Sequence, residues 1–272
     1  MRVKIIGAGS IGNHMAQASR RMGWDVAVAD NDPKALERMK NEIYPKRYGA
    51  WDSAIQLFVS DKEPRGGFDI IIIGTPPDSH MKLAVAAIKE KPRLLHIEKP
   101  LCAPDLKGVK EFQRLMRQYS KTMVTVGYDH AVSAGIEVVA DMARKGVIGK
   151  IITFDVEFRE HWKGIFSAHP WLTGPWDTYL GYWKRGGGAG GEHSHALHLW
   201  LFFSRSLGWG SIRDVKALFD FKKERGAEYD RIAEFLIRAQ KGGVGRVVQD
   251  VVTYPVRKWL LILGEKGFIE WH

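Results

Sequence analysis

The segment Gly7–Gly12 has the sequence Gly-Ala-Gly-Ser-Ile-Gly, which is the spacing of a dinucleotide-binding loop. It directly follows a short apolar run and opens a helix-length stretch. Gly7 permits a tight turn, Gly9 lets backbone amides approach a pyrophosphate, and Gly12 lets the helix pack closely on the strand. The segment therefore predicts a site where the N-terminus of a helix faces the phosphates of a dinucleotide.

An acidic residue follows where such a site needs one. The next apolar run, 25–30, ends in Asp30, 18 residues after the last glycine of the loop. A carboxylate there accepts hydrogen bonds from both ribose hydroxyls of adenosine and repels a 2′-phosphate, so we predict that NAD is the cofactor. Asn31 and the basic residues Lys34 and Arg38 lie nearby, and they leave NADP as the alternative.

A second loop follows the run Ile70–Ile73 and contains Thr75, Pro76 and Pro77. Ligands bind at the carboxyl edge of open parallel sheets, and proline fixes the backbone there, so this loop is a candidate wall beside the cofactor. An ordinary turn between a strand and a helix is the other interpretation. His80 lies in the first turn of the helix that follows.

The elements that position these residues alternate between short β-rich runs and amphipathic helix-length stretches, a pattern typical of an α/β domain with a doubly wound parallel sheet, the Rossmann fold. The expected strands are 2–6, 25–30, 68–74, 93–97 and 122–127. The expected helices are 11–22, 33–42, 78–90 and 104–119.

The pattern changes near residue 127. After one more helix, at 133–145, long β-rich runs follow one another with few helices between them, which predicts an α+β domain with a mostly antiparallel open sheet. These runs are 150–162, 211–222, 228–240, 243–252 and 258–263. We therefore expect a dinucleotide-binding domain at 1–127 and a domain for substrate binding and oligomerisation at 128–272. The aromatic and glycine-rich stretch 162–192 is expected to be a long loop at the substrate.

The sequence Glu98-Lys99-Pro100-Leu101, taken together with the glycine loop, Asp30 and Gly-Thr-Pro-Pro-Asp-Ser-His, resembles the Gfo/Idh/MocA family of oxidoreductases. The resemblance implies an N-terminal Rossmann domain and a C-terminal α/β domain whose open sheet often serves as a dimer face. It also implies that Lys99 contacts substrate and nicotinamide, next to a strained or cis bond before Pro100.

Downstream, the family carries three glycines, an acid and a histidine that opens a helix. This pattern is filled by Gly186–Gly188, Glu192 and His195. The acid is glutamate where most members have aspartate, and the histidine follows it by three positions where many members have four. A neutral imidazole suits removal of a hydroxyl proton during hydride transfer. We therefore expect His195 to accept the proton and Lys99 to stabilise the developing negative charge on oxygen.

The expected cofactor contacts are Gly7, Gly9, Ser10, Ile11, Gly12, Asp30, Asn31, Thr75, Pro76, Pro77, His80, Glu98 and Lys99. The expected catalytic residues are Lys99, His195 and Glu192. The expected substrate contacts are Lys99, Tyr128, His130, His169, Tyr179, Glu192 and His195. For His169 and Tyr179, packing against the sheet is an equal alternative to substrate stacking.

No metal is expected, because the histidines near Glu192 lack the helical signature of two histidines four apart with a glutamate between them. The composition is that of a globular protein and does not indicate a nucleic-acid partner. The 272 residues are 45% apolar and 26% charged with a single cysteine, and the net charge of +10 comes from scattered residues, which argues against nucleic acid as a partner. The N-terminus resembles a strand rather than a leader, and no apolar run approaches the roughly 20 residues of a membrane span, so we expect a cytoplasmic protein.

Together these features predict an NAD(P)-dependent dehydrogenase acting on a secondary hydroxyl of a sugar, cyclitol or nucleotide-sugar, assembled as a homodimer or homotetramer through its C-terminal sheet. Two alternatives use the same parts. One is a lyase or hydrolase that oxidises its substrate transiently, and the other is a non-catalytic regulator that senses a dinucleotide.

Overall fold

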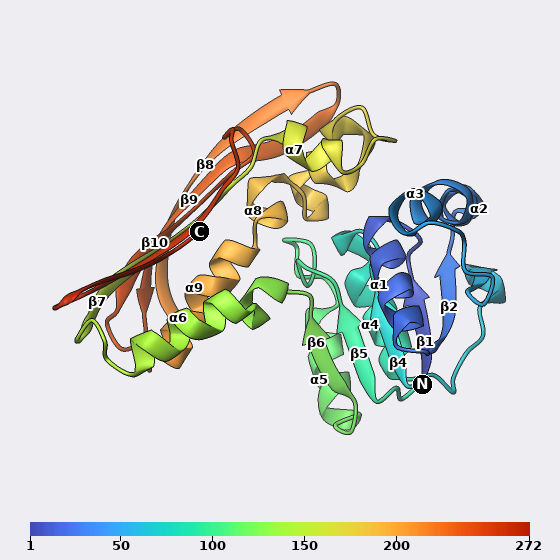
Figure 1. Ribbon diagram of the computed structural model, residues 1–272, viewed down its shortest axis with the longest axis horizontal. Coiled ribbons are helices and arrows are strands. Elements are labelled where there is room, and N and C mark those ends of the chain that lie inside the picture. Colours follow the sequence, from blue (N-terminus) through green and yellow to red (C-terminus); the bar gives the residue numbers. More distant parts are fainter. The chain divides into compact units, whose positions relative to one another are not determined.

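In a computed structural model of residues 1–272, the apolar runs of the first half form a six-stranded parallel sheet in the order β3-β2-β1-β4-β5-β6 (Figure 1). Its strands are β1 (Arg2–Ile6), β2 (Asp25–Asp30), β3 (Gln56–Val59), β4 (Ile70–Ile73), β5 (Leu94–Ile97) and β6 (Met123–Val126). The order reverses between β1 and β4, and this reversal confirms the predicted doubly wound sheet.

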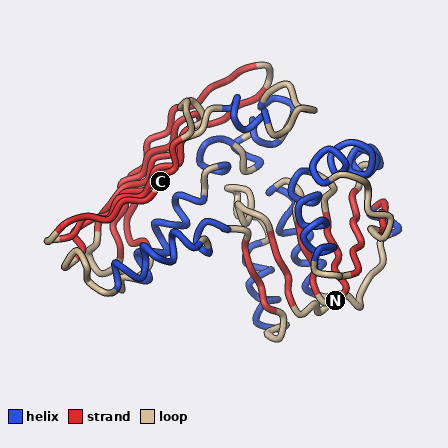
Figure 2. Tube along the Cα trace, in the orientation of Figure 1, coloured by secondary structure: helices blue, strands red, loops and turns tan.

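Helices cover both faces of this sheet, as Figure 2 shows. They are α1 (Ser10–Arg21), α2 (Pro33–Arg38), α3 (Tyr44–Tyr48), α4 (Pro77–Ile88) and α5 (Val109–Gln118). Alternate strand residues feed two separate cores: Ile5 and Val28 pack with Ala16 of α1, while Ile71 and Ile73 pack with the helices on the other face. The strand of four isoleucines is buried throughout because it has helices on both sides.

Three details of this half differ from the sequence prediction. Strand β3 was not expected, because it is an edge strand with no fully buried residue and therefore lacks the continuous apolar run that marks β4. The helix expected from residue 104 begins at Val109, directly after Gly108, whose positive φ of 84° ends the preceding loop. The helix expected at 33–42 passes into a π-helical turn over Met39–Ile43 before α3, where Pro45 cannot donate a backbone hydrogen bond.

The second half forms another six-stranded sheet, in the order β12-β11-β7-β10-β9-β8. Its strands are β7 (Ile151–Arg159), β8 (Ile212–Glu224), β9 (Ala227–Ala239), β10 (Val244–Asp250), β11 (Arg257–Gly264) and β12 (Gly267–Trp271). Only β10 and β7 run parallel, so the sheet is mostly antiparallel as predicted. The short hairpin strand β12 was not expected.

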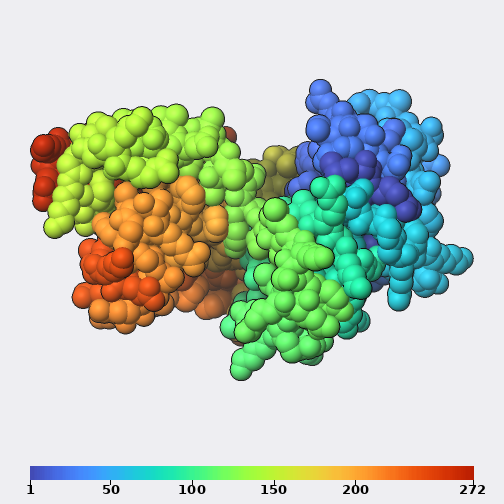
Figure 3. Space-filling model, turned by 90° about the horizontal axis from the view of Figure 1, so that it is seen from below, coloured from blue at the N-terminus to red at the C-terminus, as the bar shows by residue number.

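One face of this sheet is covered by α6 (Ala134–Arg144) and α9 (His195–Ser206), which lie side by side in Figure 3. Their apolar residues bury Phe154, Val156 and Phe158 of β7 together with Trp200 of α9. The opposite face carries exposed apolar side chains on β8 and β9.

The stretch 162–192 is more ordered than the predicted long loop. It contains α7 (Trp162–Ser167), three short 3-10 turns and α8 (Gly188–Glu192). Trp162 and Leu180 pack with Tyr229 of β9 in a core of their own, so aromatic residues that looked like a lid hold this segment on the sheet.

By contact, the chain divides into two units, Met1–Gly127 and Tyr128–His272. None of the helices combines the length and the apolar character that crossing a membrane requires.

Candidate functional site

The glycine loop joins β1 to α1 at the point where the strand order reverses. Gly7 has a φ of 112°, and a Cβ atom there would lie 2.7 Å from the carbonyl oxygen of Gly74 in the loop after β4. A Cβ atom on Gly12 would overlap the carbonyl oxygen of Gly7, whereas one on Gly9 would meet nothing within 4 Å. Gly9 therefore borders open space beside the first turn of α1, and this is the room that a pyrophosphate needs.

Asp30 ties the end of β2 to this loop. One carboxylate oxygen accepts a hydrogen bond from the backbone N–H of Ala8 at 2.7 Å, and the other accepts from Asp32 N–H at 2.9 Å. Each oxygen has a second lone pair, so the carboxylate can still accept the two ribose hydroxyls. Asn31 directly follows Asp30, in the turn before α2.

His80 lies beneath the loops that follow β4 and β5. Its Nε2 is 2.7 Å from the carbonyl oxygen of Thr75, and its Nδ1 is 3.0 Å from that of Pro100. Burial lowers the pKa of the imidazole, although the two carbonyl contacts oppose this effect. Because the side chain is wholly buried, it supports the Thr75–Pro77 loop and the Lys99–Pro100 loop from below.

Lys99 follows β5 at the same carboxyl edge. The backbone N–H of Lys99 donates to the Glu98 carboxylate at 3.2 Å, and the peptide bond to Pro100 is cis, as the family resemblance implies. Glu98 is itself buried and lies 3.4 Å from Nε2 of His96. The carboxylate of Glu98 also explains why residue 127 is a glycine, because a Cβ atom at that position would lie 2.7 Å from the glutamate oxygen.

In the second unit, a cluster of rings surrounds the start of α9. His195 is the first residue of that helix, and its Nδ1 lies 3.5 Å from Oδ1 of Asp129. The same oxygen is 2.9 Å from Nδ1 of His130, and the two imidazole centroids are 4.6 Å apart. Tyr128 lies edge-on to His195 and stacks on His198 at 4.2 Å.

Asp129 is a functional candidate that the sequence analysis missed. Its side chain is exposed, and although some desolvation favours the protonated form, the neighbouring His195 and His130 outweigh this and hold its pKa below the usual range. Its only signal in the sequence was its position directly before His130. The three side chains also offer one carboxylate oxygen and two imidazole nitrogens within 4.8 Å of one another, a set that could hold a divalent cation.

The other predicted substrate residues lie in the 162–192 segment. The His169 ring contacts the carbonyl oxygen of Ile165 at 2.7 Å, so it caps the end of α7. Tyr179 starts a 3-10 turn and packs against the core beneath α8. Glu192 is the last residue of α8, three positions before His195.

Asp230 of β9 explains the glycine run that precedes His195. Its carboxylate accepts the Gly190 N–H at 2.6 Å, and a Cβ atom on Gly188 would overlap it. The side chain is 4% exposed, and burial raises its pKa to about 6, although the Gly190 hydrogen bond opposes the shift. Glycine is thus required where α8 packs on this carboxyl group.

Asp230 predicts a pH-dependent stability. Because its folded pKa is above that of the unfolded chain, the folded state holds an extra proton in the window between about pH 4 and pH 6, and the free energy of unfolding falls by about 3 kcal/mol as the pH rises through it. In Asp230→Asn this component disappears. Chemical denaturation at several pH values checks the prediction, with Asp214→Asn, an exposed aspartate of β8, as control. Identical pH dependences for wild type and Asp230→Asn would contradict it.

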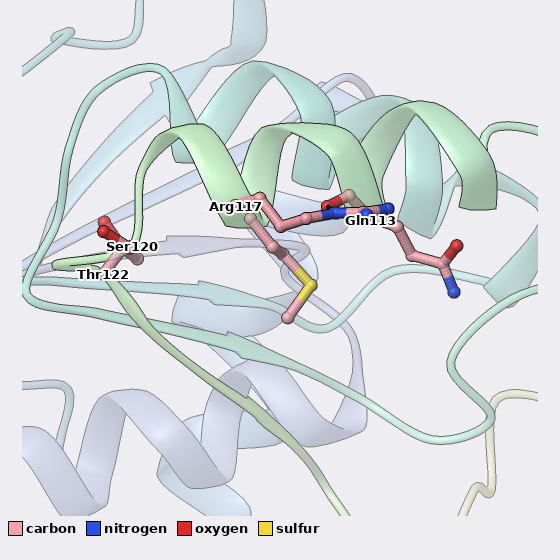
Figure 4. Close-up of a pocket in the computed structure, with 5 residues that line it drawn as sticks. Gln113, Arg117, Ser120 and Thr122 are labelled. Carbon is pink, nitrogen blue, oxygen red and sulfur yellow. Dashed lines mark hydrogen bonds between the residues drawn. The ribbon is translucent and has the colours of Figure 1, made fainter.

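A surface hollow beside α5 is unrelated to these groups. Gln113, Met116, Arg117, Ser120 and Thr122 line it, as the close-up in Figure 4 shows. Thr122 precedes β6, so the hollow lies at the amino edge of the sheet, opposite the glycine loop.

Residues 1–128 match the Gfo/Idh/MocA family model, which is described as an oxidoreductase family with an NAD-binding Rossmann fold. This match confirms the predicted NAD-binding domain. No curated protein matches the sequence.

Several solved structures share the fold of the whole chain. GenD2 from gentamicin A biosynthesis, in complex with NAD, is 18% identical with a TM-score of 0.77, covering 100% of this chain and 72% of its own. The WlbA dehydrogenase from Bordetella pertussis, in complex with NADH and UDP-GlcNAcA, is 22% identical with a TM-score of 0.75, covering 99% and 73%. A myo-inositol dehydrogenase from Corynebacterium glutamicum is 20% identical with a TM-score of 0.74, covering 100% and 74%. At these identities the similarity establishes the fold.

Proposed function

Since residues 1–128 belong to the Gfo/Idh/MocA oxidoreductase family as its NAD-binding Rossmann domain, we propose that the protein is an NAD-dependent dehydrogenase. Its substrate is a sugar, cyclitol or nucleotide-sugar, of which it oxidises a secondary hydroxyl. The observation that carries the proposal is the Asp129 carboxylate 3.5 Å from Nδ1 of His195, beside a second imidazole.

The chemistry follows from what these groups can do. Oxidation of a carbinol carbon removes a hydride from carbon and a proton from oxygen, and NAD takes up the hydride when bound. In the proposal, His195 accepts the hydroxyl proton. Asp129 stabilises the imidazolium that forms, since opposite charges a few ångströms apart attract each other.

Lys99 has a complementary role in the proposal. It follows β5 at the carboxyl edge of the parallel sheet, the edge at which such sheets bind dinucleotides. Its ammonium group is proposed to stabilise the negative charge that develops on the substrate oxygen. Tyr128, His130 and Glu192 are proposed to contact the substrate.

The substrate class is supported by the fold relatives and by the side chains themselves. The relatives include a protein solved with UDP-GlcNAcA and a myo-inositol dehydrogenase. The cluster around His195 combines hydrogen-bonding imidazoles with the ring of Tyr128, and aromatic faces pack well against the C–H faces of sugar rings.

A substrate panel tests the function. Purified protein is mixed with NAD and, separately, with inositols, hexoses and nucleotide-sugars, and the absorbance of the reduced nicotinamide is followed. The proposal expects reduction with at least one of them. Binding of NAD without any reaction would favour the sensing regulator, and product formed without net reduction of NAD would favour the lyase or hydrolase.

We also propose that the open face of the second sheet joins copies of the chain. Leu218 of β8 and Leu236 of β9 are 70% and 62% exposed, and their cross-strand neighbours Glu234 and Lys216 bear opposite charges. Apolar side chains among charges of both signs are typical of a self-complementary interface.

The double variant Leu218→Asp, Leu236→Asp is therefore expected to be a monomer, because each copy of the chain would bring two charges into the buried interface. Size-exclusion chromatography with light scattering measures the mass. Val138→Asp, on α6 and 59% exposed in the wild type, is the control that keeps the oligomer. A monomeric wild type, or an unchanged mass in the double variant, would contradict the proposal.

A further inference from the structure

An arginine that belongs to none of the sequence motifs lies against the glycine loop. Arg47 is near the end of α3, and its Nη2 donates to the Ser10 hydroxyl at 2.9 Å while its Nη1 donates to the Ser10 carbonyl oxygen at 3.2 Å. Ser10 is the first residue of α1, the helix whose N-terminus borders the open space at Gly9. A permanent positive charge is thus held beside the predicted phosphate position.

A small network fixes the direction of this side chain. Nη1 of Arg47 is 3.2 Å from Nε2 of His14, and the hydroxyl of Tyr48 contacts the other ring nitrogen of His14. Because a guanidinium only donates hydrogen bonds, Nε2 of His14 must accept, and the imidazole is neutral with its proton on Nδ1. The network therefore adds one positive charge, that of Arg47, to the helix N-terminus.

The chemistry of a dinucleotide fits this arrangement. The N-terminus of α1 carries a partial positive charge and backbone N–H groups, and its first turn holds no acidic residue. A guanidinium has five N–H donors, so it can keep its hydrogen bonds to Ser10 and still donate to a phosphate oxygen.

We propose that Arg47 is a cofactor-binding residue that donates to the pyrophosphate of NAD at the N-terminus of α1. The inference rests on the NAD-binding fold and not on the dehydrogenase reaction, so it can be tested without a substrate. A 2′-phosphate of NADP is the other anionic group that a guanidinium near the adenosine ribose would recognise, and the experiment separates the two.

The test is a set of dissociation constants, measured calorimetrically for ADP-ribose, NAD, NADP and adenosine. In Arg47→Ala, the affinity for ADP-ribose and for NAD falls between about tenfold and about a hundredfold, because one charged hydrogen bond is lost. The affinity for adenosine, which has no phosphate, is unchanged. The salt dependence of ADP-ribose binding also becomes shallower.

Two further variants separate charge from loop support. Arg47→Gln keeps a donor for Ser10 but removes the charge, and it should lose affinity as Arg47→Ala does, whereas Arg47→Lys should lose less. Lys46→Ala, the exposed neighbour on the same helix, is the matched control with no change. Equal losses for adenosine and ADP-ribose would show a structural role only. A loss confined to NADP, or none at all, would also overturn the proposal.

Discussion

His195→Ala lowers kcat by about 10²- to 10⁴-fold, the range that a general base supplies, while the dissociation constant for NAD stays at its wild-type value. The imidazole lies at the start of α9 in the second unit, whereas the glycine loop and Asp30 lie in the first. Steady-state kinetics with the best substrate of the panel measures kcat, and calorimetry measures NAD binding.

Arg205→Ala is the control for this substitution. Arg205 is exposed in the last turn of the same helix, and its removal leaves kcat unchanged. Asp129→Asn keeps the shape of the carboxylate but removes its charge, and the expected loss is smaller, about ten- to a hundredfold. A wild-type kcat in His195→Ala would remove this residue from the reaction.

The second large effect concerns two glycines of the same loop, whose substitution by alanine is expected to change stability and NAD binding differently. Gly12→Ala destabilises the apo-protein by about 1–3 kcal/mol and also abolishes NAD binding, because its Cβ atom would overlap the carbonyl oxygen of Gly7 and move the helix away from the strand. Gly9→Ala leaves the apo-protein as stable as the wild type, since its Cβ atom meets nothing within 4 Å.

Gly9→Ala nevertheless weakens NAD binding about a hundredfold, because the methyl group fills the space that the pyrophosphate needs. Alanine readily adopts the φ of −74° found at Gly9, so backbone strain does not contribute to the effect of Gly9→Ala. Thermal unfolding with and without NAD measures both effects. A destabilised Gly9→Ala apo-protein, or one that binds NAD normally, would show that the pyrophosphate does not occupy this space.

Much of the architecture could be predicted because its signals are local. The glycine loop, Asp30 and the Lys99 motif each lie within a few residues of a strand end, and the order of strands and helices follows from hydrophobic period and length. The edge strands β3 and β12 were missed because they carry few buried residues, and α8 was missed because three of its five residues are glycine, which disfavours a helix. The 162–192 stretch looked like a loop because its glycines are typical of loops. Their role is to pack against the Asp230 carboxyl group of a strand that is distant in the sequence.

By itself, the sequence determined the parallel sheet, the dinucleotide loop and its acid, since these depend on residues adjacent in the chain. Only the tertiary structure placed Asp129 beside His195, 66 positions later (195 − 129), and Arg47 beside Ser10. The physical reason is that such contacts depend on how helices pack and on where each helix begins. No local pattern of residue types records either.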